Sequence, residues 1–411
     1  MQRLGVAVIH IPAEIRAKLI FVVGDPDQVA NAPVQVFEAK RLDFLADLSA
    51  ALLEQPDIRS LPDVVAFAFW CRRANLLRIA SSAKEGRLRV GLGLVFRICP
   101  SNVPVNFAFS LAFGLLAGNA CVVRMPTKEH LSARVIVDAI AKLLATKEHA
   151  SQRSHVHLVK FEHDDQVNEY WLTVADGKVV WGGDATVAHM RALKSRSRSR
   201  EVAFPDRYSF CAIEPKKVLE STDEELGDLC TKLFNDIYLM NQNACSSPQL
   251  LSWIGSVTEI EKAKARLWLA FEDYIKSRYA IEPIHAMDKF VAACSNILSN
   301  GNIKHVERQN NLLYRIELTR LSDRQQDQRG YFGTVHEVSL QNLAQLAPII
   351  DDRFQTLTYF GFDREQLERF VINSQLRGID RIVPVGKALD MGVIWDGYDI
   401  VSNLSRIVDI Q

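Results

Sequence analysis

The sequence has no excess of charge of either sign, because 49 lysine and arginine residues balance 49 aspartate and glutamate residues. A nucleic-acid-binding protein would show a basic excess, and a disordered chain would hold fewer hydrophobic residues than the 48% found here. The composition is therefore that of a globular chain that binds no nucleic acid. At 411 residues the chain is too long for one ordinary core, which predicts two or three domains.

Paired cysteines are missing as well. The seven cysteines are widely spaced and odd in number, and the sequence has no CxxC motif and no cluster of histidine and cysteine. This pattern argues against a disulfide framework and against a zinc site, so we expect no metal and a location in the reducing cytoplasm. The cysteines are Cys71, Cys99, Cys121, Cys211, Cys230, Cys245 and Cys294.

The sequence also lacks a long uninterrupted apolar run. A signal peptide needs a long apolar core near the N-terminus. The charged residue Glu14 occurs here before such a core has formed, so we expect no signal peptide. The most apolar stretch, residues 103–123, contains Pro104, Asn106 and Asn119, whose polar groups a lipid-facing helix would have to bury. We expect a buried helix followed by a strand there, and no membrane span.

Helical periodicity dominates the first part of the chain. Residues 37–55 have the apolar spacing of an amphipathic helix, and residues 61–83 predict a second helix. Residues 88–126 then read as strand, loop, helix and strand, a βαβ unit that predicts a parallel sheet covered by helices. Ligands bind beyond the carboxyl ends of the strands in such sheets, which places the loop from Pro100 to Asn106 at a ligand-binding edge.

A later strand-to-helix turn carries two glycines. Residues 131–161 continue the pattern with a helix and a strand, and in residues 178–194 a strand is followed by Gly182, Gly183 and a helix. The unpaired N–H groups of a helix N-terminus suit a phosphate. Two glycines after a strand are also a common turn, so both interpretations stay open on spacing alone.

Strands and helices alternate again after residue 205. We expect the strand at 208–213 to close the first half, with a domain boundary at Pro215. Residues 296–330 are polar and look irregular apart from one strand at 313–318. Before this stretch we expect a helix at 223–239, a strand at 249–255 and a helix at 257–279, and after it strands and helices alternate again.

The stretch LMNQNACSSPQ, residues 239–249, has the features of a reactive site around Cys245. Small and polar residues flank this cysteine and leave its sulfur accessible, and its place after a helix puts it on a turn, where catalytic groups often lie. The alternative is a buried cysteine that packs as a small hydrophobe. From the residues alone these two interpretations are balanced.

Six stretches follow one another along residues 90–411: CPSNVP with GLLAGNACVVR, WGGDATV, FPDRYSF, MNQNACSSPQ, QTLTYFG, and RIVPVGKALDMGVIWDGYDIVSNLSR. In this order they resemble the acyl-CoA reductases of the bacterial luminescence type, a branch of the aldehyde dehydrogenase superfamily. The resemblance implies two α/β domains with a cleft between them. They are a Rossmann-like cofactor domain with an N-terminal helical scaffold (1–214) and a catalytic domain (215–384). The C-terminal segment (385–411) would pack back on the first domain or serve in oligomerisation.

The resemblance assigns the chemistry to Cys245, which would take an acyl group as a thioester before a nicotinamide hydride releases it as an aldehyde. A thiolate is nucleophilic enough to attack a thioester and is a good enough leaving group to depart again. Asn102 matches the position whose side-chain amide stabilises the oxyanion, and the backbone N–H of Cys245 would be the second donor. The activity implied is that of an NADP-dependent acyl-CoA reductase.

The cofactor residues follow from the same resemblance. Pro100 lies at the ligand edge, and Gly182 with Gly183 matches the glycine turn that approaches the cofactor diphosphate. The superfamily usually has a glutamate that holds the adenosine ribose, but this sequence has Lys128 there, with Arg124 nearby. A cation attracts a 2′-phosphate, so we expect NADPH rather than NADH. Two solvated cations at a strand end are the alternative.

Glu337 matches a second glutamate of the superfamily, which holds the nicotinamide ribose, although a surface strand residue fits the sequence equally well. His336 beside it is a candidate proton carrier, because histidine titrates near neutral pH. The glutamate that serves oxidising members as general base has no counterpart near FPDRYSF. Its absence favours reduction of a thioester over hydrolysis of the acyl-enzyme.

The resemblance implies partners as well. These are an acyl-CoA or carrier-bound acyl substrate from fatty acid metabolism, an acyl-transferring synthetase, and further copies of the chain in a homo-oligomer. The sequence leaves the acyl chain length open. Two alternatives remain: a CoA-acylating aldehyde dehydrogenase that runs in the oxidative direction, and a non-catalytic relative in which Cys245 only packs.

Overall fold

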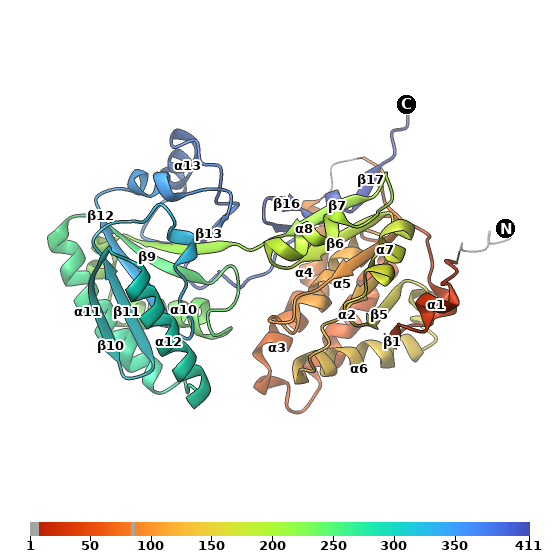
Figure 1. Cartoon of the computed structure of the whole chain (residues 1–411), viewed down its shortest axis with the longest axis horizontal. Coiled ribbons are helices and arrows are strands. Elements are labelled where there is room, and N and C mark those ends of the chain that lie inside the picture. The colour runs from red at the N-terminus through yellow and green to blue at the C-terminus, as the bar shows by residue number, and fades with distance from the viewer. Residues whose placement is uncertain (1–7, 84–86) are drawn as a thin grey trace. The chain divides into compact units, whose positions relative to one another are not determined.

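The computed structural model describes residues 8–83 and 87–411, which form two compact units (Figure 1). Unit 1 comprises Met1–Pro205 and Met391–Gln411, and unit 2 comprises Asp206–Asp390. Each unit is built on one large sheet whose strands are mostly parallel, with helices packed on it. The predicted α/β class is therefore confirmed, while the assignment of cofactor binding and catalysis to separate domains stays a prediction.

Unit 1 contains a six-stranded sheet in the order β1-β5-β4-β3-β6-β7. β1 is antiparallel to β5, and the other neighbours are parallel. β4 and β5 lie on one side of β3, whereas the next strands along the chain, β6 and β7, lie on its other side. This reversal makes the carboxyl edge between β3 and β6 a topological switch point. The strands are β1 Ile20–Val23, β3 Leu94–Ile98, β4 Ala120–Arg124, β5 Val156–Lys160, β6 Gly177–Trp181 and β7 Arg200–Phe204.

Helices cover both faces of this sheet. Alternate strand residues belong to two different hydrophobic clusters, as expected for strands buried on both faces. α2 to α6 contribute to one cluster, and α1, α7 and α8 contribute to the other. The helices are α1 Ala13–Arg16, α2 Ala39–Leu53, α3 Pro62–Trp70, α4 Arg73–Ser82, α5 Asn106–Leu116, α6 Leu131–Ala145, α7 Asp165–Val174 and α8 Asp184–Ala192.

Two sequence predictions in unit 1 have different outcomes. Residues 103–123 form the fully buried helix α5 followed by strand β4, as predicted. Among the described residues, no helix has both the length and the apolarity to cross a membrane. The single helix predicted at 61–83 is wrong, because α3 ends before Arg72 and α4 begins after it. Continuing α3 would turn Asn75 and Arg78 toward the core, whereas the break buries Leu76 and Ile79 instead.

The last residues of the chain return to unit 1. β17 (Ser405–Ile407) pairs antiparallel with β2 (Arg89–Gly91), and Asn119 Nδ2 donates to the carbonyl oxygen of Leu404 over 2.9 Å. This segment also contains β15 (Ile394–Trp395), β16 (Tyr398–Asp399) and α14 (Ile400–Asn403). A role of this segment in oligomerisation stays a prediction.

Unit 2 contains a seven-stranded sheet in the order β10-β11-β12-β9-β8-β13-β14. In the described part of the chain, β10 and β11 are the only neighbouring strands of this sheet that run antiparallel, and all other neighbouring pairs are parallel. The strands are β8 Tyr208–Ile213, β9 Pro248–Ile254, β10 Ile303–Gln309, β11 Leu313–Leu318, β12 Thr334–Leu340, β13 Phe354–Phe360 and β14 Arg381–Pro384. The helices are α9 Pro215–Glu220, α10 Asp223–Tyr238, α11 Val257–Lys276, α12 Pro283–Ser299 and α13 Arg364–Asn373.

Strand β8 lies inside this sheet, between β9 and β13. All six of its residues are buried, so it needs a neighbour on each side and packing on both faces. The sequence prediction placed this strand at the end of the first half, with a boundary at Pro215. The compact units instead divide between Pro205 and Asp206.

The connection from α10 to β9 carries Cys245. Asn241 and Gln242 both have left-handed backbones, with φ of 50° and 61°, a conformation that costs energy in residues other than glycine. The Gln242 side chain stabilises it, since Nε2 donates to the carbonyl oxygens of Pro248 and Thr334, both over 2.9 Å. Its Oε1 accepts from the backbone N–H groups of Gly333 and Thr334, both over 3.1 Å. One buried amide therefore joins this connection to the start of β12.

A second buried group holds the segment after β14. Asp236 on α10 is 1% exposed, and its carboxylate accepts hydrogen bonds from the backbone N–H groups of Gly386 (2.7 Å) and Ala388 (2.9 Å). Burial raises the pKa of Asp236 from 3.8 to about 7, although the two N–H groups act in the opposite direction.

We expect Gln242→Ala to lower the free energy of unfolding by about 3 kcal/mol, because buried backbone groups lose their partners. Urea denaturation followed by tryptophan fluorescence measures this change. Asn243→Ala is the matched control, because Asn243 is exposed on the same connection and its side chain donates to the carbonyl oxygen of Asn241 over 3.3 Å. It should change stability by less than about 0.5 kcal/mol. Equal losses in the two variants would refute the special role of Gln242.

We expect the stability contribution of Asp236 to fall as the pH rises. Between about pH 4 and pH 7 the native carboxyl stays protonated while the unfolded one ionises, so the raised pKa stabilises the native state only at low pH. Asp236→Asn cannot titrate. The stability difference between wild type and this variant should therefore shrink by about 2 to 3 kcal/mol from pH 5 to pH 8 in chemical denaturation. A difference that stays constant across this range would contradict the raised pKa.

Candidate active site

Cys245 lies on a turn three residues before β9, and its side chain is half-buried. Five of the other cysteines are buried, and only Cys294 on α12 has similar exposure in the described chain. The predicted position of Cys245 on a turn after a helix is confirmed. Its accessibility favours a reactive thiol over a cysteine that only packs.

Groups from three other segments surround Cys245. Ser209 Oγ on β8 donates to the carbonyl oxygen of Cys245 over 2.7 Å, and Gln355 Nε2 on β13 donates to its sulfur over 3.4 Å. Arg381 on β14 is close enough for its guanidinium and the Cys245 thiol to influence each other electrostatically. Burial lowers the pKa of Arg381, while Asp390, Asp236 and Cys245 act in the opposite direction. The surroundings of the sulfur therefore include a hydrogen-bond donor and a cation.

The sequence alone predicts no role for Ser209, Gln355 or Arg381. Each lies in one of the stretches that carried the family resemblance, namely FPDRYSF, QTLTYFG and RIVPVG. Their place in these stretches is the signal that could have identified them. In the fold, residues of these three stretches lie close to Cys245 in a fourth stretch, MNQNACSSPQ.

The predicted cofactor residues of unit 1 lie along one edge of its sheet, together with the predicted catalytic residue Asn102. Pro100 and Asn102 follow β3, Arg124 ends β4 and Lys128 follows it, all at the carboxyl ends of parallel neighbours. Gly182 and Gly183 follow β6, which is parallel to β3 on its other side. Because β3 and β6 border the switch point, this edge is where a nucleotide is expected to bind.

The glycine turn after β6 leaves the N-terminus of α8 accessible. Gly183 is the N-cap residue, no side chain caps the helix, and a Cβ on Gly183 would meet nothing within 4 Å. At Gly182 a Cβ would lie 3.0 Å from the Thr186 side chain, so the close turn itself favours glycine there. A helix N-terminus fits a diphosphate, although Asp184 in the first turn adds negative charge.

The two candidate cations for a 2′-phosphate differ in their surroundings. Arg124 is partly buried, with its guanidinium 4.4 Å from the centre of the Phe161 ring and a hydrogen bond of 3.4 Å to the Phe161 carbonyl oxygen. Burial lowers the pKa of Arg124. Lys128 is exposed. Lys128 is therefore the cation better able to reach a ligand at this edge.

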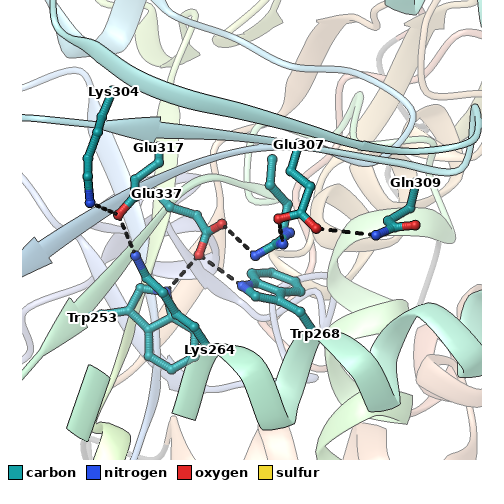
Figure 2. A network of polar contacts seen from close by, with 9 residues as sticks. Trp253, Lys264, Trp268, Lys304, Glu307, Gln309, Glu317 and Glu337 are labelled. Atoms are coloured by element: carbon teal, nitrogen blue, oxygen red, sulfur yellow. Dashed lines mark hydrogen bonds and ion pairs between the residues drawn. The ribbon is translucent and has the colours of Figure 1, made fainter. Parts of the chain in front are cut away.

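Glu337 lies inside strand β12, where it is 2% exposed. Figure 2 shows its carboxylate between Trp253 and Trp268, whose indole N–H groups donate to Oε2 over 2.8 and 2.9 Å. Arg315 donates to Oε1 over 3.4 Å. The alternative that Glu337 is a surface strand residue is therefore wrong. Both of its oxygens already accept from protein donors, and its role toward a nicotinamide ribose stays a prediction.

His336 does not fit the role of proton carrier. It is 1% exposed, and burial lowers its pKa to about 4, so the imidazole stays neutral at neutral pH. The interpretation from the sequence assumed an ordinary histidine pKa.

Among the residues in 8–83 and 87–411, no three metal-binding side chains come together and no disulfide forms.

The chain is similar to known proteins in sequence and in fold. The family model described as acyl-CoA reductase (LuxC) matches residues 50–409. The long-chain acyl-protein thioester reductase of Vibrio harveyi is 27% identical over 178 residues, which are 42% of this chain and 34% of that protein. The match thus spans about a third of that relative's length.

Two solved structures share the fold. Aldehyde dehydrogenase 21 from Physcomitrella patens has a TM-score of 0.60 at 12% identity, with 90% of this chain and 85% of that chain covered. Glyceraldehyde-3-phosphate dehydrogenase from Methanocaldococcus jannaschii, complexed with NADP, has a TM-score of 0.58 at 14% identity, with 90% and 88% covered. Since the family model extends over residues 50–409, which include all four stretches that meet around Cys245, the chain belongs to the acyl-CoA reductase (LuxC) family and has an aldehyde dehydrogenase-like fold.

Proposed function

We propose that this protein reduces an acyl thioester to an aldehyde through a thioester intermediate on Cys245, with NADPH as the reductant. The observation that carries the proposal is the half-buried thiol on a turn that buried polar side chains fix in place. Family membership supports the reaction class, because the matching family is named for acyl-CoA reduction and the Vibrio harveyi relative for reduction of an acyl-protein thioester.

In this reaction the Cys245 sulfur acts first as a nucleophile and then as a leaving group. As a thiolate, its sulfur attacks the carbonyl carbon of the substrate, a new C–S bond forms, and the original C–S bond breaks as the carrier thiolate leaves and takes up a proton. The bound nicotinamide would supply a hydride to the acyl carbon. The Cys245–acyl bond then breaks, the sulfur departs with the bonding electrons, and the aldehyde is released.

Both steps place negative charge on the acyl oxygen, which needs hydrogen-bond donors. We assign the backbone N–H of Cys245 as one donor and the side-chain amide of Asn102 as the other. Asn102 is exposed on the loop after β3, and its assignment rests on its match to the family motif.

The carboxyl edge of the unit 1 sheet fits a dinucleotide. Gly182, Gly183 and the N-terminus of α8 would hold the diphosphate, Pro100 would border it, and Lys128 would contact the 2′-phosphate. Arg124 and Glu337 remain further candidates for cofactor contacts.

The acyl donor is proposed to be acyl-CoA or an acyl group carried on a protein, delivered with the help of an acyl-transferring synthetase to a homo-oligomer of this chain. The second candidate function is acylation of CoA in the oxidative direction. It uses the same thiol and the same edge of unit 1.

Cys245→Ala should abolish covalent acylation. After incubation with radiolabelled acyl-CoA and denaturation, we expect label on the wild-type protein and none on the variant, because the thioester needs the sulfur. Cys294→Ala is the matched control, since Cys294 has similar exposure and lies on α12, away from the converging stretches. Label that persists in Cys245→Ala, or that disappears in Cys294→Ala, would remove Cys245 from the mechanism.

Lys128→Glu should reverse the cofactor preference. A carboxylate repels the 2′-phosphate, so we expect kcat/KM for NADPH to fall at least about tenfold while that for NADH changes little. Assays of aldehyde formation with each cofactor measure the ratio. Lys147→Glu makes the same charge change after the C-terminal end of α6, at the opposite edge of the sheet, and should leave the ratio unchanged. The same ratio in all three proteins would show that Lys128 does not contact the 2′-phosphate.

A further inference from the structure

The stretch QTLTYFG begins with Gln355, a residue that has no role in the proposed reaction so far. Gln355 is the second residue of β13, and its side chain is 1% exposed. A buried amide must find hydrogen-bond partners within the protein. Here Nε2 donates to the sulfur of Cys245 over 3.4 Å, and Oε1 accepts from the Thr356 hydroxyl over 3.3 Å.

The neighbours of Gln355 contact Cys245 as well. The Thr356 hydroxyl donates to the oxygen end of the amide, and the NH₂ end contacts the sulfur. The backbone N–H of Thr356 donates to Ser209 Oγ over 3.2 Å, and Ser209 in turn donates to the carbonyl oxygen of Cys245 over 2.7 Å. Adjacent strands β8 and β13 therefore hold both the carbonyl group and the sulfur of the same cysteine.

An N–H donor interacts more strongly with a charged sulfur than with a neutral one. The proposed reaction produces a charged Cys245 sulfur twice, once before attack on the thioester and once when the bond to the acyl carbon breaks after reduction. Between these points the sulfur belongs to a neutral thioester and is a weak acceptor. The contact with Gln355 is thus strongest when the sulfur is charged. Before attack it raises the fraction of the thiol that is ionised, and after reduction it stabilises the charge that grows on the departing sulfur.

We propose that Gln355 is a catalytic residue whose amide N–H stabilises the Cys245 sulfur as a thiolate, both as the attacking group and as the leaving group. This inference rests on the proposed function for the second of these roles. The first role concerns the unacylated protein alone, so it can be tested without an acyl donor or a cofactor.

The test is the pH dependence of Cys245 alkylation by iodoacetamide in the full chain, since only the thiolate reacts. Cys245→Ala supplies the background from the other cysteines. In Gln355→Leu we expect the midpoint of the alkylation profile to rise by about one pH unit, which slows alkylation about tenfold at pH 7. Gln355→Glu keeps the shape of the side chain but places a negative charge beside the sulfur, so its midpoint should rise further.

Gln326→Leu is the matched control. Gln326 is also a buried glutamine of unit 2, but its amide donates to Asp351 Oδ2 over 3.3 Å. Its profile should coincide with that of the wild type, even if its unfolding temperature falls. The second readout is aldehyde formation at saturating substrate, where kcat should fall about tenfold in Gln355→Leu with little change in KM.

Profiles of Gln355→Leu and Gln355→Glu that coincide with the wild type would overturn the proposal. Failure of both variants to fold would also overturn it, because Gln355 would then be a structural residue. If the proposed function fails instead, acyl-CoA leaves no label on Cys245 while the alkylation midpoints still shift. The two failures therefore give different results.

Discussion

The connection that carries Cys245 depends on one buried amide in a strained backbone. Gln242 has a left-handed φ, and its side chain makes four hydrogen bonds to backbone groups around the starts of β9 and β12. A hydrophobic side chain could fill the same space, but it would leave those backbone groups unpaired and the turn free to adopt other conformations. Hydrogen bonds are directional, so this amide determines the path of the chain as well as stabilising it.

Similar anchors recur around the candidate site. Gln249 Oε1 accepts from the backbone N–H of Gly330 over 2.8 Å, and Lys289 Nζ donates to three carbonyl oxygens, including that of Phe332 over 2.7 Å. Asp236 does the same for the segment after β14. The loops near Cys245 are thus attached by buried polar side chains to backbone groups. Such contacts hold a loop in one geometry, whereas apolar packing would tolerate several. A nucleophile requires a single geometry, because its reacting atom must be held in line with the substrate.

The sequence predicted most of the fold because apolar periodicity reports directly on burial. It failed where a neighbour in space decided the structure. Strand β10 (Ile303–Gln309) was missed because it is a polar edge strand, and β8 was placed in the wrong half because six buried residues do not reveal which sheet buries them. Cys245 was identifiable from its local surroundings. Ser209 and Gln355 were not, because their contacts with Cys245 join residues 36 and 110 positions apart in the chain.

In each unit the candidate groups lie at one edge of that unit's own sheet, the carboxyl edge in unit 1 and the amino edge in unit 2. This difference explains why the thiol needs side-chain donors. In unit 1 the glycine turn lies at the carboxyl edge, where α8 begins and its N-terminus carries partial positive charge. In unit 2, Cys245 precedes β9 and therefore lies at the amino edge, while the helices that follow β8, β9 and β13 begin at the other edge. Its connection follows the C-terminal end of α10, so no helix N-terminus precedes Cys245 on this connection. A thiolate there must be stabilised by other groups, and the amide of Gln355 and the guanidinium of Arg381 are the donor and the cation that the fold places beside it.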